Sequence, residues 1–131
     1  MSRKQASIQL KLAKAKSLLD EVPVLLAHQF YNTAVNRAYY ACFHATKALL
    51  LTKDVSPKTH SGVVHQLHLH FVKNGLFHAD QAAFFSNIMH ERIEDDYNDE
   101  AFTNPDAVQK FVESATAYVT YIETLIPTPE F

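Results

Sequence analysis

The stretch from Asn32 to Leu51, NTAVNRAYYACFHATKALLL, decides the fold of this chain. Small side chains recur in it at steps of three and four residues: Ala34, Ala38, Ala41, Ala45 and Ala48. This spacing places the alanines on one face of a helix, where they let a second helix approach closely. Most of the other positions are apolar, so little of the helix is free to face water. The stretch therefore predicts the central helix of a helical bundle.

A second stripe on the same predicted helix is polar. Arg37, Tyr40, His44 and Lys47 follow the same spacing of three and four residues. A guanidinium, a phenol, an imidazole and an ammonium are thus expected along one edge of the helix. Such an edge is the first candidate for a functional site.

The composition favours a single helical domain over residues 1–131. The sequence is 47% hydrophobic and contains only 2 glycines and 5 prolines, which suits a compact helical fold. The formal charge of -2 argues against a globally basic nucleic-acid-binding protein. The net charge does not exclude a local basic edge. The single cysteine, Cys42, excludes an internal disulfide and a cysteine-based zinc site.

No apolar run approaches the roughly 20 residues that a membrane-spanning helix needs. The polar start MSRKQ is not followed by the apolar core of a signal sequence. We therefore expect a cytoplasmic protein without a membrane partner.

Four further helices are predicted around the central one. The first runs from Ser2 to Glu21, and Pro23 leaves open whether Val22 to Gln29 continues it or forms a separate turn. The others begin at Ser56 or Thr59 and end at Asn74-Gly75, run from a cap at Asp80 to Asp99, and run from Asn104-Pro105-Asp106 to Pro127. The predicted fold is all-α, an up-and-down antiparallel bundle of four long helices plus one shorter helix.

Arg37 and His44 lie seven residues apart, or two helical turns, so both project from one face. In a functional interpretation Arg37 anchors a phosphate and His44 acts as a general acid or base. In a structural interpretation Arg37 pairs with a carboxylate of a neighbouring helix, and His44 is a hydrogen-bonded histidine at the edge of the core. Arg92 and Asp96 have the same two interpretations: they stabilise the packing of the bundle, or they bind a ligand.

Four histidines of the third helix are candidate metal ligands: His60, His65, His68 and His70. His65 and His68 could share an ion, but no acidic residue completes the site at a second helical spacing. His90-Glu91 opens like a zinc-protease motif, which fails because position 94 is Glu94. The sequence predicts neither a metal nor a cofactor.

Several segments, taken in order, resemble the HEPN domain family, whose name stands for higher eukaryote and prokaryote nucleotide-binding. They are Ala34 to Leu50, Thr59-His60-Ser61-Gly62, Phe71 to Gly75, and Arg92 with Asp96-Tyr97. The resemblance covers Ile8 to Ile126 and is closest to the small stand-alone prokaryotic branch. It implies a bundle of four or five antiparallel helices that often dimerises. It also implies pairing with a minimal nucleotidyltransferase in toxin–antitoxin or defence modules.

Many members of this family are metal-independent ribonucleases, with an Arg and a His separated by four to six residues late in the domain. In this sequence no histidine follows Arg92. Arg37 and His44 have six residues between them, but they lie on an earlier helix.

Three functional hypotheses follow. The first is a module that binds a nucleotide or RNA, or docks a nucleotidyltransferase, through Arg37, Tyr40, His44, Lys47, Arg92, Asp96 and Tyr97. The second is an RNA-cleaving toxin in which Arg37 stabilises phosphorane charge and His44 moves the proton. The third is a structural homodimer without a ligand. We favour the first.

Overall fold

The computed structural model of the chain describes residues 2–91 and 104–128, and every regular element in them is helical. The elements are α1 (Arg3–Ala27), α2 (Tyr31–Leu51), α3 (His60–Leu67), the π-helix η1 (His68–Val72), α4 (Ala79–His90) and α6 (Pro105–Leu125). The all-α prediction is confirmed. Within the described residues, none of the helices combines the length and the apolar character required to cross a membrane.

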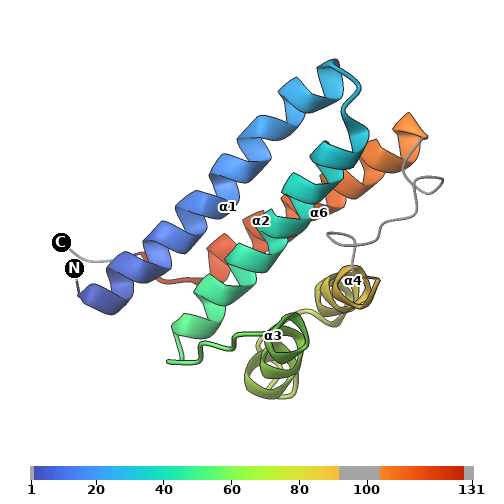
Figure 1. Cartoon of the computed structure of the whole chain (residues 1–131). Helices are drawn as coiled ribbons and strands as arrows, with labels where there is room; N and C mark the ends of the chain where they lie inside the picture. The colour runs from blue at the N-terminus through green and yellow to red at the C-terminus, as the bar shows by residue number, and fades with distance from the viewer. Residues whose placement is uncertain (1, 92–103, 129–131) are drawn as a thin grey trace.

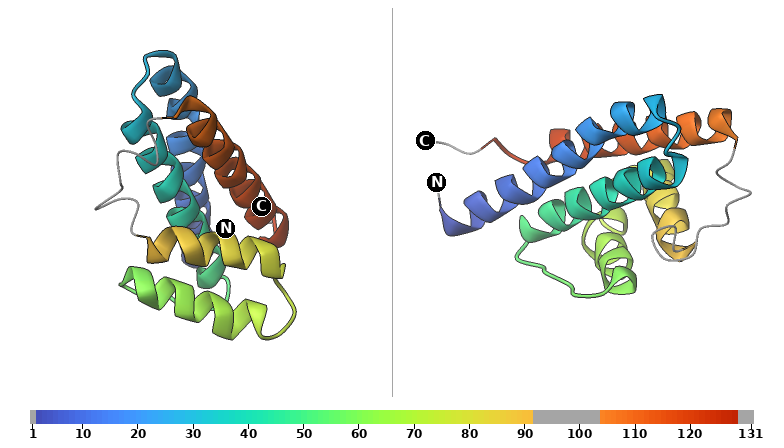
Figure 2. Two further views of the ribbon diagram at one scale, coloured as in Figure 1. Left: turned by 90° about the vertical axis from the view of Figure 1, so that its right-hand side faces the viewer. Right: turned by 45° about the horizontal axis from the view of Figure 1, so that its top comes forward.

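The three longest helices lie side by side, with α2 between the other two (Figure 1). α2 packs along both α1 and α6, whereas α1 and α6 contact each other much less. α1 and α2 run antiparallel, as a short connection requires. α6 runs in the same direction as α2 (Figure 2). This parallel arrangement follows from the long connection between them, which holds α3, η1 and α4. The structure therefore departs from the predicted up-and-down order of four long helices, because the shorter α3, η1 and α4 fill the connection (Figure 2).

α3 continues directly into η1, and together they form a hairpin with α4 that crosses the three long helices near the end of α2 (Figure 2). The turn of the hairpin contains Gly75, whose φ is 74°. Glycine adopts this left-handed conformation without steric cost. The predicted end at Asn74-Gly75 is confirmed.

Side-chain caps fix several helix starts. Ser2 and Gln5 form a reciprocal capping box on α1. The Thr59 hydroxyl accepts from the Gly62 amide at 2.9 Å, so Thr59 and not Ser56 caps α3. Asn104 caps α6 as predicted, with Pro105 in the first turn.

Three boundaries differ from expectation or settle an alternative. α4 ends at His90, whereas its predicted end at Asp99 lies outside the described residues. α1 continues through Pro23 to Ala27 as a single helix, so the residues after Pro23 do not form a separate turn. The predicted cap at Asp80 is wrong, because α4 begins at Ala79 and His78 holds the cap position. Asp80 instead lies in the first turn, where a carboxylate interacts favourably with the helix dipole.

The core is centred on α2. All five alanines of the predicted stripe are fully buried, which confirms the role assigned to this helix. Thr46 is the one buried polar residue on the described part of the chain. Its hydroxyl donates to the Cys42 carbonyl at 2.8 Å and lies 2.7 Å from the Tyr118 hydroxyl of α6. This contact ties α2 to α6 inside the core.

Candidate functional site

The polar stripe of α2 lies at the surface of the bundle, where α2 meets α1. Arg37, Tyr40, His44 and Lys47 are all partly buried, whereas the residues between them are mostly fully buried. The spacing therefore places all four on one edge, as predicted. The other half of this edge comes from α1, which the sequence had not linked to the site.

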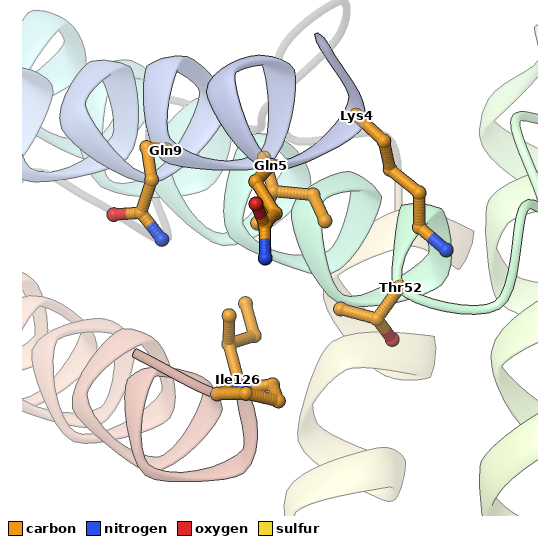
Figure 3. Close-up of a pocket in the computed structure, with 7 residues that line it drawn as sticks. Lys4, Gln5, Gln9, Thr52 and Ile126 are labelled. Carbon is orange, nitrogen blue, oxygen red and sulfur yellow. The ribbon is translucent and has the colours of Figure 1, made fainter. Parts of the chain in front are cut away.

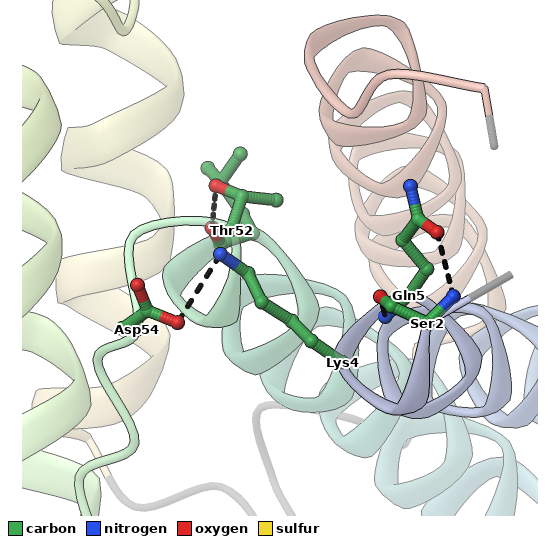
Figure 4. A network of polar contacts seen from close by, with 6 residues as sticks. Ser2, Lys4, Gln5, Thr52 and Asp54 are labelled. Carbon is green, nitrogen blue, oxygen red and sulfur yellow. Dashed lines mark hydrogen bonds and ion pairs between the residues drawn. The ribbon is translucent and has the colours of Figure 1, made fainter. Parts of the chain in front are cut away.

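Two ion pairs show how α1 is aligned with α2. Arg37 Nε lies 3.4 Å from Glu21 Oε1 at one end, and Lys4 Nζ lies 3.1 Å from Asp54 Oδ1 at the other (Figure 4). In both pairs the two residue numbers add up to 58. Along two antiparallel helices, residues that lie opposite each other have residue numbers with a constant sum. Each residue of this edge can therefore be assigned the residue opposite it on the other helix.

This alignment places Lys14 opposite His44, and Lys11 opposite Lys47, at the same heights along the two helix axes. The four charged positions on α1 are spaced by seven, three and seven residues. Arg37, His44 and Lys47 on α2, followed by Asp54 in the turn after this helix, have the same spacing. The ends of the edge thus carry ion pairs of opposite charge, while its middle holds three lysines and a histidine. We call Lys11, Lys14, His44 and Lys47 the basic edge.

The electrostatics of His44 agree with this placement. Burial lowers the pKa of His44, and the positive charges of Lys14, Lys47 and Lys11 lower it further, to about 4. The imidazole is therefore neutral at pH 7. The rings of Phe43 and Tyr40 flank it, with centroids 5.7 Å and 6.2 Å away.

Arg37 is held by polar partners. Besides the ion pair with Glu21, its Nη1 donates to Asn36 Oδ1 at 3.3 Å. The guanidinium is about one-third exposed. Pairing with a carboxylate of a neighbouring helix is the structural interpretation given above, and the structure shows that pair.

Two lysines of the basic edge have neutral partners. Lys11 Nζ donates to Ser7 Oγ at 3.2 Å, and Lys47 Nζ lies 5.4 Å from the centre of the Phe43 ring. Within residues 2–91 and 104–128, no ion pair with a carboxylate is recorded for Lys11, Lys14 or Lys47. The middle of the edge therefore keeps its positive charge.

An aromatic cluster lies on the side of α2 that faces the α3–α4 hairpin. The Tyr39 hydroxyl lies 2.9 Å from His60 Nδ1 and donates to Met89 Sδ at 3.2 Å. The Phe43 ring lies 4.6 Å from the His60 ring. His60 belongs to one of the segments on which the family resemblance rests, but its contact with Tyr39 was not predicted.

Three of the predicted ligand-binding residues, Arg92, Asp96 and Tyr97, lie outside the described residues. Two other histidines of the third helix bond locally: His68 Nδ1 lies 3.0 Å from the Val64 carbonyl, and His70 Nε2 lies 2.9 Å from Gln66 Oε1. In the described part of the chain, no three histidines, cysteines or acidic residues gather as metal ligands would.

Two cavities of the structure lie away from the basic edge. One of about 180 Å³ opens between the start of α1 and the end of α6, where Gln5 and Gln9 face Ile126 (Figure 3). A second, of about 330 Å³, follows α1 toward Asp20 and includes the Lys16–Glu123 ion pair. Neither contains a predicted site residue. Because polyanions are bound mainly by surface charge, we consider the basic edge a better candidate than either of these two cavities.

Comparison with known proteins identifies the family of this chain. The HEPN domain model matches residues 8–125 of the chain. The chain belongs to the HEPN family. A UPF0332 protein of Thermotoga maritima is 32% identical over 126 residues, which cover 96% of each chain.

Two relatives carry functional names. A Methanocaldococcus jannaschii protein named "Putative toxin MJ0605" is 34% identical over 116 residues, or 88% of this chain and 86% of its own. Another from the same organism, "Putative toxin MJ0142", is 32% identical over 96 residues, or 73% of this chain and 65% of its own. This HEPN domain is thus similar to proteins that are named as toxins.

Proposed function

We propose that this HEPN domain is a cytoplasmic module that binds RNA or a nucleotide, and that it is one half of a toxin–antitoxin or defence pair. Arg37, Tyr40, His44 and Lys47 contribute the binding surface. The observation that carries the proposal is the positive charge that remains at the centre of the α1–α2 edge. The names of two relatives support the toxin context.

Charge and aromatic rings on one surface suit single-stranded RNA. Lysine and arginine neutralise the phosphates, and the affinity then falls steeply with salt. The partly buried Tyr40 ring lies beside His44, with the two ring centroids 6.2 Å apart, and aromatic rings next to a basic surface are typical of proteins that bind single strands. An acidic overall composition does not oppose this, because the charge that matters is local.

The direct test is fluorescence anisotropy with a labelled single-stranded RNA at several salt concentrations. We expect binding whose affinity decreases with salt. Lys47→Ala is expected to weaken it, whereas Lys16→Ala, a control on the α1–α6 side, is expected to leave it nearly unchanged. Equal affinities for the two variants would contradict a site on this edge.

RNA cleavage by Arg37 and His44 is the second candidate, and one observation favours it. Since the His44 imidazole is neutral at pH 7, it could accept a proton from a ribose hydroxyl. Two observations favour binding instead: Glu21 holds the guanidinium of Arg37, and a pKa of about 4 makes His44 a weak base at neutral pH.

Cleavage is tested with the same RNA, analysed on a denaturing gel. A nuclease loses its activity in His44→Ala while its circular dichroism spectrum stays native. Intact RNA after incubation with wild-type protein would leave the binding function alone. Growth on induction of wild type, Arg37→Ala and His44→Ala shows in parallel whether toxicity depends on these residues.

We further propose that the domain forms a homodimer and docks a nucleotidyltransferase. Large apolar side chains are exposed near the α1–α2 turn, with Val24 62% and Phe30 57% accessible, and such side chains often mark interfaces. Light scattering after size-exclusion chromatography tests the dimer. Co-purification with a nucleotidyltransferase encoded beside this gene tests the partner, and a monomer that captures no such protein would contradict this part.

A further inference from the structure

The basic edge has a charge pattern that its own helices do not neutralise. Opposite charges pair at both ends of the edge: Glu21 with Arg37, and Lys4 with Asp54 in the turn after α2. Between these ends, the same alignment places Lys11 opposite Lys47, and both lysines act on His44. Like charges that face each other across a helix interface repel. A bound anion would remove this repulsion.

The two pairs in the middle of the edge, Lys14 with His44 and Lys11 with Lys47, are close enough to contact the same ligand. Lys11 and Lys14 are three residues apart, as are His44 and Lys47, which corresponds to about 4.5 Å along each helix axis. Lys14 is exposed and the other three are partly buried, so all four are accessible from one side. Arg37 lies seven residues beyond His44 and is occupied by Glu21.

We propose that Lys11, Lys14 and Lys47 form a binding site for consecutive, covalently linked phosphate groups, with the His44 ring as its floor. The biological ligand of this site rests on the proposed function, whereas the site itself rests on the alignment of α1 with α2. It assigns a binding role to two lysines of α1, whereas Arg37, which Glu21 holds, borders the site at one end of the edge.

Linked phosphates fit the spacing of Lys11, Lys14 and Lys47 better than an acidic peptide does. Each phosphate follows the previous one within a few bonds and carries its charge on oxygens that several ammonium groups can share. Neighbouring carboxylates of an extended peptide point to opposite sides. Lysine ammonium groups are compact charges on flexible stems, so three of them can converge on one chain of phosphates.

The test is calorimetric titration with inorganic tripolyphosphate, which contains linked phosphates but no base or sugar. The key variant is Lys11→Gln/Lys14→Gln, and the matched control is Lys16→Gln/Lys110→Gln, which removes the same charge from exposed lysines of α1 and α6. We expect the key variant to bind about tenfold or more weakly than wild type, and the control to change by less than about threefold.

A second readout locates the ligand. Bound phosphate should oppose the effect of the lysines on His44, so the NMR titration of its ring should move to higher pH when tripolyphosphate is added. Lys11→Gln/Lys14→Gln should abolish this shift. Both variants replace exposed or partly exposed lysines, and circular dichroism verifies their fold.

The outcomes separate the site from the proposed function. Tripolyphosphate binding that depends on Lys11 and Lys14, without RNA binding, would support the site and contradict the RNA function. Absence of tripolyphosphate binding, equal losses in the two double variants, or equally tight binding of oligoglutamate would overturn the site. RNA binding that survives Lys11→Gln/Lys14→Gln but is lost in Arg37→Ala would overturn it as well.

Discussion

The hydrogen bond between Thr46 and Tyr118 offers a sharp test of how α2 and α6 are joined. Both residues are fully buried, and their hydroxyl oxygens lie 2.7 Å apart. Since the Thr46 hydroxyl donates to the Cys42 carbonyl at 2.8 Å, its oxygen accepts from Tyr118. Thr46→Val keeps the shape of the side chain but leaves the Tyr118 hydroxyl without its acceptor.

The magnitudes follow from which group is left unpaired. Thr46→Val should cost about 1–3 kcal/mol of unfolding free energy, because a buried donor loses its partner. Tyr118→Phe should cost about 0.5–1.5 kcal/mol, because the remaining Thr46 hydroxyl keeps its bond to Cys42. The double variant removes both hydroxyls and should cost less than the sum of the single variants, by about 1 kcal/mol or more.

Urea unfolding followed by circular dichroism measures all four proteins. Scaling the usual unfolding entropy to 131 residues converts each kcal/mol to about 3–4 °C in Tm. A double variant whose loss equals the sum of the two single losses would show that the hydroxyls do not share a bond, and would refute this account of the core. The Phe85 ring, stacked on Tyr118 at 5.3 Å, remains in place in every variant.

Three further predictions concern the cysteine and the edge. Burial raises the pKa of the Cys42 thiol, so folded protein should react with a thiol reagent far more slowly than protein in urea; equal rates would contradict its burial. Because the folded-state pKa of His44 is depressed to about 4, its protonation favours the unfolded chain. Wild type should therefore lose more stability between pH 7 and pH 4 than His44→Gln does, as measured by urea unfolding, and identical losses would contradict the shift. Glu21→Gln should release Arg37 and cost less than about 1 kcal/mol of stability. It should also tighten RNA binding more than Glu123→Gln, which changes the net charge equally. The same anisotropy change in both variants would mean that only net charge matters.

The sequence predicted the central helix well because its signals are local. The alanine spacing fixes which face of α2 is buried, whatever packs against it. Asn104-Pro105-Asp106 marks a helix start through the chemistry of three adjacent residues. The polar stripe of Arg37, Tyr40, His44 and Lys47 is local in the same sense, since one helix determines it.

The remaining features depend on how distant segments align. Lys11 and Lys14 share a spacing pattern with His44 and Lys47 that is visible in the sequence. That pattern becomes a site only when the turn after Ala27 fixes the alignment of α1 with α2. No local signal gives this alignment.

The crossing of the α3–α4 hairpin and the parallel course of α2 and α6 likewise arise from tertiary packing. Asp80 misled the prediction because a residue suited to a cap also suits the first turn.

The measurement that tests the central claim most directly is a map of amide chemical-shift changes on addition of single-stranded RNA to isotopically labelled protein. We predict that the largest changes follow the α1–α2 edge, at Lys11, Lys14, His44 and Lys47. Changes confined to the α1–α6 side, or to the α3–α4 hairpin, or no changes at saturating RNA, would contradict the account.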